Sequence, residues 1–293
     1  MQYSQFVPTM PGPRGDRGAD VVCVILAIVE HPELANRTLA AAGCLSQLMG
    51  HARIDVLGIR TPPEATIMPS EEVLTRSQER QIREREERRL AGLRRVFDAW
   101  AGKVQSATMQ LKWFDVEGLP DVVVQEWGRR ADVIVLKRPS GPDRVSERGA
   151  IHAALFETDR PVLVVPPERA PSSFGRRLAI AWRDDKFTIR AVLAALRFAT
   201  QADHVFILAG VRQGTPAPAI PDIFIEHGVE AELLLLPIGS QPFGEALLAK
   251  AHELGADMLV LGAFVHNPAR RLILGGVTRT ILERADLPVL MRH

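Results

Sequence analysis

Two stretches of the sequence decide the fold: Ala131-Asp132-Val133-Ile134-Val135-Leu136 and Ala256-Asp257-Met258-Leu259-Val260-Leu261. Each is a short, continuous apolar run, which is typical of a strand buried on both faces of a parallel sheet. Each is followed by a polar, basic stretch, a short helix and a second apolar phrase, Arg160–Val165 in the first half and Leu287–Met291 in the second. Matching phrases at matching intervals indicate two duplicated domains of the βαβ type.

The rest of the chain continues this alternation. We expect strands at 21–29, 53–59, 108–114, 132–136, 161–165, 178–182, 204–209, 233–236, 258–261 and 288–291. We expect helices at 34–49, 71–100, 121–130, 150–156, 188–200, 223–227, 244–254 and 277–285. Strands that alternate with helices predict parallel sheets joined by right-handed crossovers. The predicted fold is therefore α/β, with two tandem open-twisted parallel five-stranded sheets that carry helices on both faces.

A dense run of proline and serine, from Pro166 to Ser173, separates the two periodic halves and is typical of a linker. We therefore predict a disordered tail at 1–19, rich in Pro, Gly and Arg, a first domain at 20–167, a linker at 168–176 and a second domain at 177–293.

Composition narrows the range of partners and locations. The 293 residues are 46% hydrophobic and 24% charged, with a formal net charge of +1, so global charge gives no reason to expect nucleic acid or a membrane. The long helix at 71–100 is either an RNA-binding face or a solvated face, and its nearly balanced charges favour the second. No apolar run reaches the roughly 18 residues needed to span a bilayer, and no secretory signal is recognised, so a cytoplasmic location is expected. Cys23 and Cys44 are interpreted as small buried hydrophobes rather than a redox pair.

Ligands of open parallel sheets bind beyond the carboxyl ends of the strands, at the point where the strand order reverses. In the second half, Arg183-Asp184-Asp185 follows the strand at 178–182, and Gly262 follows the strand at 258–261. A loop then leads to Gly275-Gly276, directly before a helix. Exposed amides and a favourable dipole make a helix N-terminus a phosphate site. The glycine pair is thus either a phosphate cradle or a tight turn into the helix.

Other side chains near this crevice fit the same chemistry. Arg270, Arg271 and Arg279 add positive charge, Thr278 offers a hydroxyl in the first helical turn, and Asp184 is placed to accept hydrogen bonds from a ribose.

Two further residues have two readings each. Trp182 either stacks on an adenine or fills the edge of the core. His266 either contacts a phosphate or is a solvated loop histidine. The other histidines lack metal-ligand spacing, so no metal site is expected. The candidate nucleotide-binding residues are Trp182, Asp184, Gly262, Ala263, Val265, His266, Arg271, Gly275, Gly276, Val277 and Thr278.

The C-terminal stretch resembles the signature of universal stress proteins. Their ATP-binding members carry Gly, two residues, Gly, nine residues, and then Gly with Ser or another small polar residue. On this chain the first and third glycines of that pattern are Gly262 and Gly275, whereas Val265 stands at the second and Gly276 at the Ser position. The ending Pro288–His293 resembles a tandem bacterial subgroup. The resemblance implies an adenine nucleotide α-hydrolase-like, Rossmann-like fold and binding of ATP or a related adenine nucleotide, with Mg²⁺, in the second domain. It also implies pairing through the last strand, as a homodimer or as an intramolecular pseudo-dimer.

The sequence departs from the family pattern near the expected ligand. Val265 places a branched side chain where a backbone passes close to phosphate. The family usually has Asp directly after its first strand, whereas here Trp182 and Arg183 precede Asp184, so the acidic contact is displaced.

The first half lacks the motif. Its strand at 132–136 is followed by Lys137-Arg138-Pro139-Ser140-Gly141, and no glycine pair precedes the helix at 150–156. Its first strand ends at Glu30 and His31. We expect this domain to bind no ATP and to serve as a packing partner or to bind something else.

Three functions remain open at this point. The first is a stress-response protein that binds ATP or a related nucleotide in its second domain without fast turnover. The second is a nucleotide-free scaffold or dimerisation protein. The third, an enzyme that cleaves or activates a nucleotide, lacks paired carboxylates or an activated nucleophile at the crevice, so slow ATP hydrolysis is the most that we expect.

Overall fold

The strands form where the sequence places continuous β-branched and leucine-rich runs, and the helices form where apolar residues recur on one side. The computed structural model describes residues 23–50, 52–65, 74–104, 109–140, 144–168, 172–216, 218–239, 241–263 and 275–293. The expected tail at 1–19 and the middle of the expected linker, 169–171, lie outside these ranges.

The first half consists of five strands and four α-helices with a short 3₁₀ turn. In chain order they are β1 (Cys23–Val29), α1 (Pro32–Met49), β2 (Ala52–Arg60), η1 (Pro63–Ala65), α2 (Arg76–Ala101), β3 (Met109–Glu117), α3 (Pro120–Gly128), β4 (Val133–Lys137), α4 (Arg144–Glu157) and β5 (Val162–Val165). Helix α2 is amphipathic along its C-terminal half, where Leu90, Leu93, Phe97 and Trp100 are buried. Its remaining face is largely solvated.

The second half repeats this order. Its elements are β6 (Arg177–Trp182), α5 (Lys186–Ala199), β7 (His204–Val211), α6 (Asp222–Glu226), β8 (Glu232–Pro237), α7 (Phe243–Glu253), β9 (Met258–Gly262), α8 (Gly276–Arg284) and β10 (Val289–Arg292). Every predicted strand and helix is present, with ends that differ by a few residues. The largest differences are at α2 and α4. Helix α2 was predicted from residue 71 and begins at Arg76, with 71–73 outside the described residues, and α4 begins at Arg144 rather than at residue 150.

All ten strands lie in one sheet with the order β3-β2-β1-β4-β5-β10-β9-β6-β7-β8. Within each half the strands are parallel and have the same order, with the third, second, first, fourth and fifth strand of that half side by side. The predicted fold class is confirmed. The expectation of two separate five-stranded sheets is corrected by the junction, where β5 and β10 hydrogen-bond as antiparallel neighbours.

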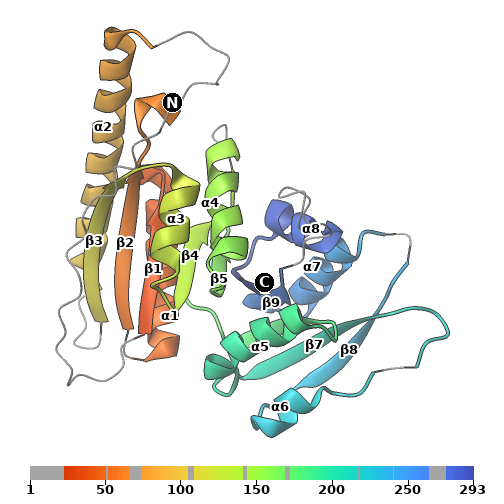
Figure 1. Cartoon of the computed structure of the whole chain (residues 1–293). Coiled ribbons are helices and arrows are strands. Elements are labelled where there is room, and N and C mark those ends of the chain that lie inside the picture. The colour runs from red at the N-terminus through yellow and green to blue at the C-terminus, as the bar shows by residue number, and fades with distance from the viewer. Residues whose placement is uncertain are drawn as a thin grey trace.

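The junction between the halves is apolar and closely packed. Val162, Leu163 and Val164 of β5 lie opposite Met291, Leu290 and Val289 of β10, and none of these side chains is more than 2% exposed. Burying six such side chains stabilises the joined sheet, because each aliphatic side chain contributes about 1.5–3 kcal/mol on burial. The last strand of each half therefore has its outer edge covered by the other half (Figure 1).

Helices cover both faces of this sheet. One apolar cluster joins α1, α2, α5 and α6 to one face, and a second joins α3, α4, α7 and α8 to the other. The arrangement confirms the prediction of helices on both faces. No helix within the described ranges is long and apolar enough to cross a membrane.

Candidate functional site

The crevice of the second half lies beyond the carboxyl ends of β6 and β9. These strands are parallel neighbours, with Ala181 opposite Leu261, and the chain leaves them toward α5 and α8 respectively. Strand β7 lies on the far side of β6, so the strand order reverses between β6 and β9. This is the switch point at which α/β sheets bind ligands.

Helix α8 connects β9 to its parallel neighbour β10, so its N-terminus lies toward the rim of the sheet at which β9 ends. Gly275 is the N-cap residue and has no side chain to accept hydrogen bonds from the first-turn amides. A Cβ added to Gly276 would meet no atom of the described residues within 4 Å, so none of these residues fills the space beside the first turn. The helix dipole adds about half a positive charge here. Gly275 and Gly276 thus form the start of α8, where Gly275 is buried and Gly276 is exposed.

Helix α5 begins at the same crevice but is capped by its own sequence. Asp185 accepts hydrogen bonds from the amides of Phe187 and Thr188, both at 2.9 Å, and forms an ion pair with Arg183. Burial by itself would raise the pKa of Asp185, but these hydrogen bonds and Arg183 lower it overall. Asp184, the residue expected to meet a ribose, is exposed beside this cap. Of the two helix starts, α8 is thus the one with no carboxylate at its N-cap.

Trp182, the last residue of β6, is half-buried and packs edge-on against Phe224 of α6, with ring centroids 5.9 Å apart. It joins the core on the α5 face of the sheet. Trp182 therefore packs at the edge of the core, and its stacking on an adenine stays a prediction.

Of the side chains that follow the glycine pair in α8, Val277 and Thr278 pack toward the core and Arg279 is exposed. Thr278 is 1% exposed and Val277 packs against the core. Arg279 forms an ion pair with Glu283 one turn later, at 3.0 Å, on the outer face. Thr278 is therefore buried, whereas Gly276 at the start of the same turn is exposed.

Gly262 is required where β9 passes the start of α5. A Cβ at this position would lie 2.7 Å from the amide nitrogen of Thr188 and 2.8 Å from the carbonyl carbon of Phe187. The next residue, Ala263, is buried, and its carbonyl lies 3.0 Å from Nδ1 of His293. The His293 ring stacks on Phe187, with centroids 4.3 Å apart. Gly262 and Ala263 thus pack against the start of α5 and against His293. The expected site residues Val265, His266 and Arg271, with Arg270, lie outside the described residues.

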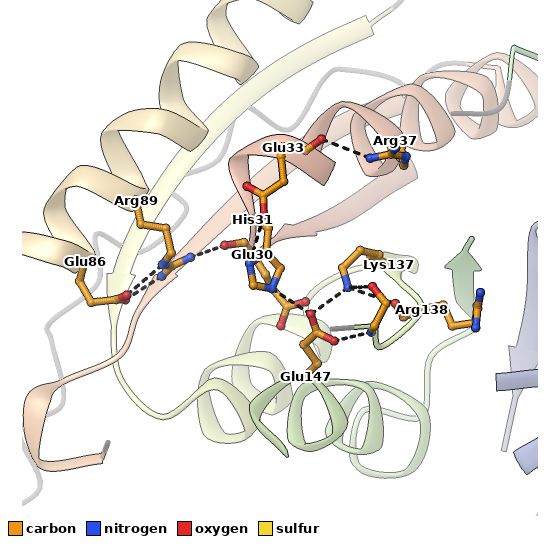
Figure 2. A network of polar contacts seen from close by, with 10 residues as sticks. Glu30, His31, Glu33, Arg37, Glu86, Arg89, Lys137, Arg138 and Glu147 are labelled. Atoms are coloured by element: carbon orange, nitrogen blue, oxygen red, sulfur yellow. Dashed lines mark hydrogen bonds and ion pairs between the residues drawn. The ribbon is translucent and has the colours of Figure 1, made fainter. Parts of the chain in front are cut away.

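The equivalent place in the first half holds a buried polar network (Figure 2). Lys137 ends β4, and Glu147 lies in the first turn of α4. The Glu147 carboxylate accepts hydrogen bonds from Nζ of Lys137 and Nε2 of His31, both at 2.8 Å, and from the amide of Ser140 at 2.6 Å. Lys137 and Glu147 are 4% and 3% exposed.

The network shifts the pKa of three of its groups, Glu147, His31 and Glu30. Burial alone would raise the pKa of Glu147, but its hydrogen bonds from His31 and Lys137 lower it to about 2. The hydrogen bond to Glu147 raises the pKa of His31. Burial, and then the neighbouring charge of Glu147, raise the pKa of Glu30. The network therefore keeps one carboxylate ionised and places positive charge around it.

Arg89 of α2 ties the long helix to the same edge of the sheet. Its guanidinium donates to the carbonyl of Glu30 at 2.6 Å and to that of Ile59. It also pairs with Glu86 at 2.8 Å. The first crevice is therefore enclosed by groups from α1, α2, β4 and α4.

Sequence reasoning named Glu30, His31 and the basic run from Lys137, but missed Glu147. The available signal was Lys137 itself, since a lysine at the end of a fully apolar strand requires a buried carboxylate partner. Among the described residues, no cluster of His, Cys, Asp and Glu suits a metal ion.

Comparison with known proteins supports the resemblance stated above. The model of the universal stress protein family matches residues 238–293, a segment that contains α7, β9, the glycine pair, α8 and β10. No curated protein matches the chain by sequence.

Solved structures extend the likeness to nearly the whole chain. A universal stress protein from Archaeoglobus fulgidus is 16% identical, with a TM-score of 0.65, and the match covers 92% of this chain and 95% of that one. A putative universal stress protein from Pseudomonas aeruginosa is 14% identical, with a TM-score of 0.57 and 93% of both chains covered. At sequence identities this low, the similarity to these structures shows that the fold is shared and says nothing about function.

Proposed function

We propose that this chain is a stress-response protein whose second domain binds ATP or a related adenine nucleotide. The universal stress protein model matches residues 238–293, and nearly the whole chain has the fold of solved universal stress proteins. The bound nucleotide is turned over slowly or not at all, because the described residues of the crevice include no activated nucleophile. The partly buried carboxylate of Asp185 caps α5 and is therefore not available as a general base.

One observation carries this proposal: at the switch point of the second half, α8 starts with two glycines, and none of the described residues fills the space beside Gly276. A phosphate group placed there meets backbone amides and the positive end of the helix dipole. Magnesium would accompany the nucleotide as the counter-ion of its phosphates.

The test is a substitution that closes the space without disturbing the fold. In Gly276→Val, the new side chain enters open space in the protein and blocks the approach of a phosphate. Gly239→Val is the matched control, because a Cβ at Gly239 also meets nothing within 4 Å and the residue follows the outer strand β8.

We expect wild-type protein and Gly239→Val to bind ATP with magnesium in a calorimetric titration, with micromolar affinity at best, and Gly276→Val to lose at least tenfold. Equal affinity in all three proteins would place the ligand elsewhere. No heat and no thermal shift in the wild-type protein would favour the alternative, a nucleotide-free scaffold.

One feature of the structure favours that scaffold as the second candidate. The β5–β10 junction joins the two halves through the strands by which family members are expected to pair. The chain is thereby built as an intramolecular pseudo-dimer, and this architecture needs no ligand. Analytical ultracentrifugation of the whole chain tests whether the β5–β10 junction replaces a junction between two subunits. If it does, the chain is expected to be a monomer.

A further inference from the structure

Three hydrogen-bond donors in the first domain converge on one carboxylate. One oxygen of Glu147 accepts from the Lys137 ammonium and the His31 ring, and the other accepts from the Ser140 amide. Lys137 also donates to the Ser140 hydroxyl at 3.0 Å and to the carbonyl of Arg138 at 3.1 Å. The donors come from two segments, His31 after β1 and Lys137–Ser140 at the end of β4, whereas the acceptor comes from a third, the first turn of α4.

The position of this carboxylate corresponds to the expected anion position in the second domain. Strand pairing places Ile28 opposite Leu136 in the first half and Ala181 opposite Leu261 in the second. The residues that follow, Lys137 and Gly262, are therefore equivalent in the two sheets. Helices α4 and α8 both follow these strands, and a carboxylate lies in the first turn of α4 but not of α8.

The physical demands of burial support the comparison. A carboxylate removed from water is retained in ionised form only where several donors replace its hydration. Lysine, a histidine ring and a backbone amide are the donors that proteins use to hold small oxyanions. The same donor set would hold a carboxylate or a phosphate oxygen that came from solution.

We propose that the first domain contains an oxyanion-binding site, formed by Lys137, His31 and the amide of Ser140, and that Glu147 occupies it as an intramolecular ligand. The site takes small carboxylates or phosphate groups once Glu147 is removed from it. In the intact protein Glu147 closes the crevice, so the first domain binds no nucleotide. This assignment is independent of whether the second domain binds one.

Other charged groups face the site and define its selectivity. Glu30 lies beside Glu147 at the end of β1, Glu33 of α1 lies 4.0 Å from the His31 ring, and Arg89 of α2 holds the Glu30 backbone. The two additional carboxyls disfavour highly charged ligands. A singly charged carboxylate is therefore the best probe.

Acetate is matched to the variant Glu147→Ala, because the substitution removes one methylene and the carboxylate, and acetate restores both. Loss of a buried ion-pair partner lowers the melting temperature by on the order of 10 °C. Adding about 100 mM acetate at pH 7 raises it again by roughly 4 °C, for a dissociation constant of about 10 mM. Sodium chloride at the same ionic strength gives no such rise.

The control is Leu155→Ala on the same helix. Leu155 is 1% exposed in the core, so its loss leaves an apolar cavity with no donors. Acetate is expected to raise the melting temperature of Glu147→Ala more than chloride does. For Leu155→Ala and the wild-type protein, acetate and chloride are expected to have the same effect. An equal acetate effect on all three proteins would overturn the proposal.

A second variant keeps the question open to refutation if Glu147→Ala does not fold. Glu147→Gln keeps the shape of the side chain but removes its charge. Because the bond to Glu147 is the largest cause that raises the pKa of His31, NMR titration of that ring is expected to show a lower value in the variant. An unchanged titration would mean that Glu147 is not bound as an anion by these donors.

Discussion

The buried carboxylate of Glu147 makes a quantitative prediction about acid stability. The perturbation is Glu147→Gln, studied in a Glu30→Gln background so that the neighbouring carboxyl does not titrate in the same range. Between pH 6 and pH 3.5 the difference in unfolding free energy between the background protein and the double variant then reports mainly on Glu147.

The magnitude follows from the shift in pKa. Hydrogen bonding lowers the pKa of Glu147 from 4.5 to about 2, and the side chain is 3% exposed, so little of the effect is screened by solvent. A shift of this size is linked to about 3 kcal/mol of stability at pH 6, at 1.36 kcal/mol per pH unit. Because the folded pKa is depressed, this contribution is fully present above pH 4.5 and is lost as the pH falls toward 2. At pH 3.5 about 2 kcal/mol should remain.

Urea unfolding, followed by circular dichroism at pH 6, 5, 4 and 3.5, measures the difference. We expect the gap between the two proteins to shrink by about 1 kcal/mol over this range. A gap that stays constant, or a double variant that is the more stable protein at pH 6, would show that the carboxylate is not held ionised by Lys137 and His31.

Two further predictions concern the core. Gly262→Ala places a Cβ against the backbone of Phe187 and Thr188, where no rotamer change relieves the contact. Thermal unfolding should therefore show a loss of about 1–3 kcal/mol in the free energy of unfolding. An unchanged free energy would mean that β9 and α5 are less closely packed. Burial raises the pKa of Cys23 to about 11, so in a Cys44→Ser variant a thiol reagent at pH 8 should react with Cys23 about a hundredfold more slowly in the folded than in the unfolded protein, and equal rates would contradict the buried position.

The strands and most helices were predictable because their signals are local. The run before Glu30 and the two repeated phrases are apolar without interruption, and such runs have few ways to be buried other than as central parallel strands. The start of α2 also has a local signal, which the prediction of residue 71 missed: Thr75 and Gln78 form a reciprocal capping box, which fixes the start of the helix at Arg76.

The candidate site was less predictable because it depends on choices between neighbours and on contacts distant in sequence. Asp184 and Asp185 are alike in chemistry, and only the backbone direction at the end of β6 decides that Asp185 caps α5. The pairing of β5 with β10 depends on how two finished halves meet, which no local pattern encodes. Glu147 sits in a polar stretch, and its burial follows from the position of Lys137.

The antiparallel β5–β10 junction determines where the two switch-point crevices lie relative to each other. Since strands on its two sides run in opposite directions, the two switch-point crevices open at opposite rims of the continuous sheet. Helix α8 bridges this separation: its first residue, Gly276, borders one crevice, and the carbonyl of Glu283 near its end accepts a hydrogen bond from Arg138, the neighbour of Lys137 in the other. A helix about 13 Å long therefore connects the proposed nucleotide site at one rim to the Lys137–Glu147 site of the first domain at the other.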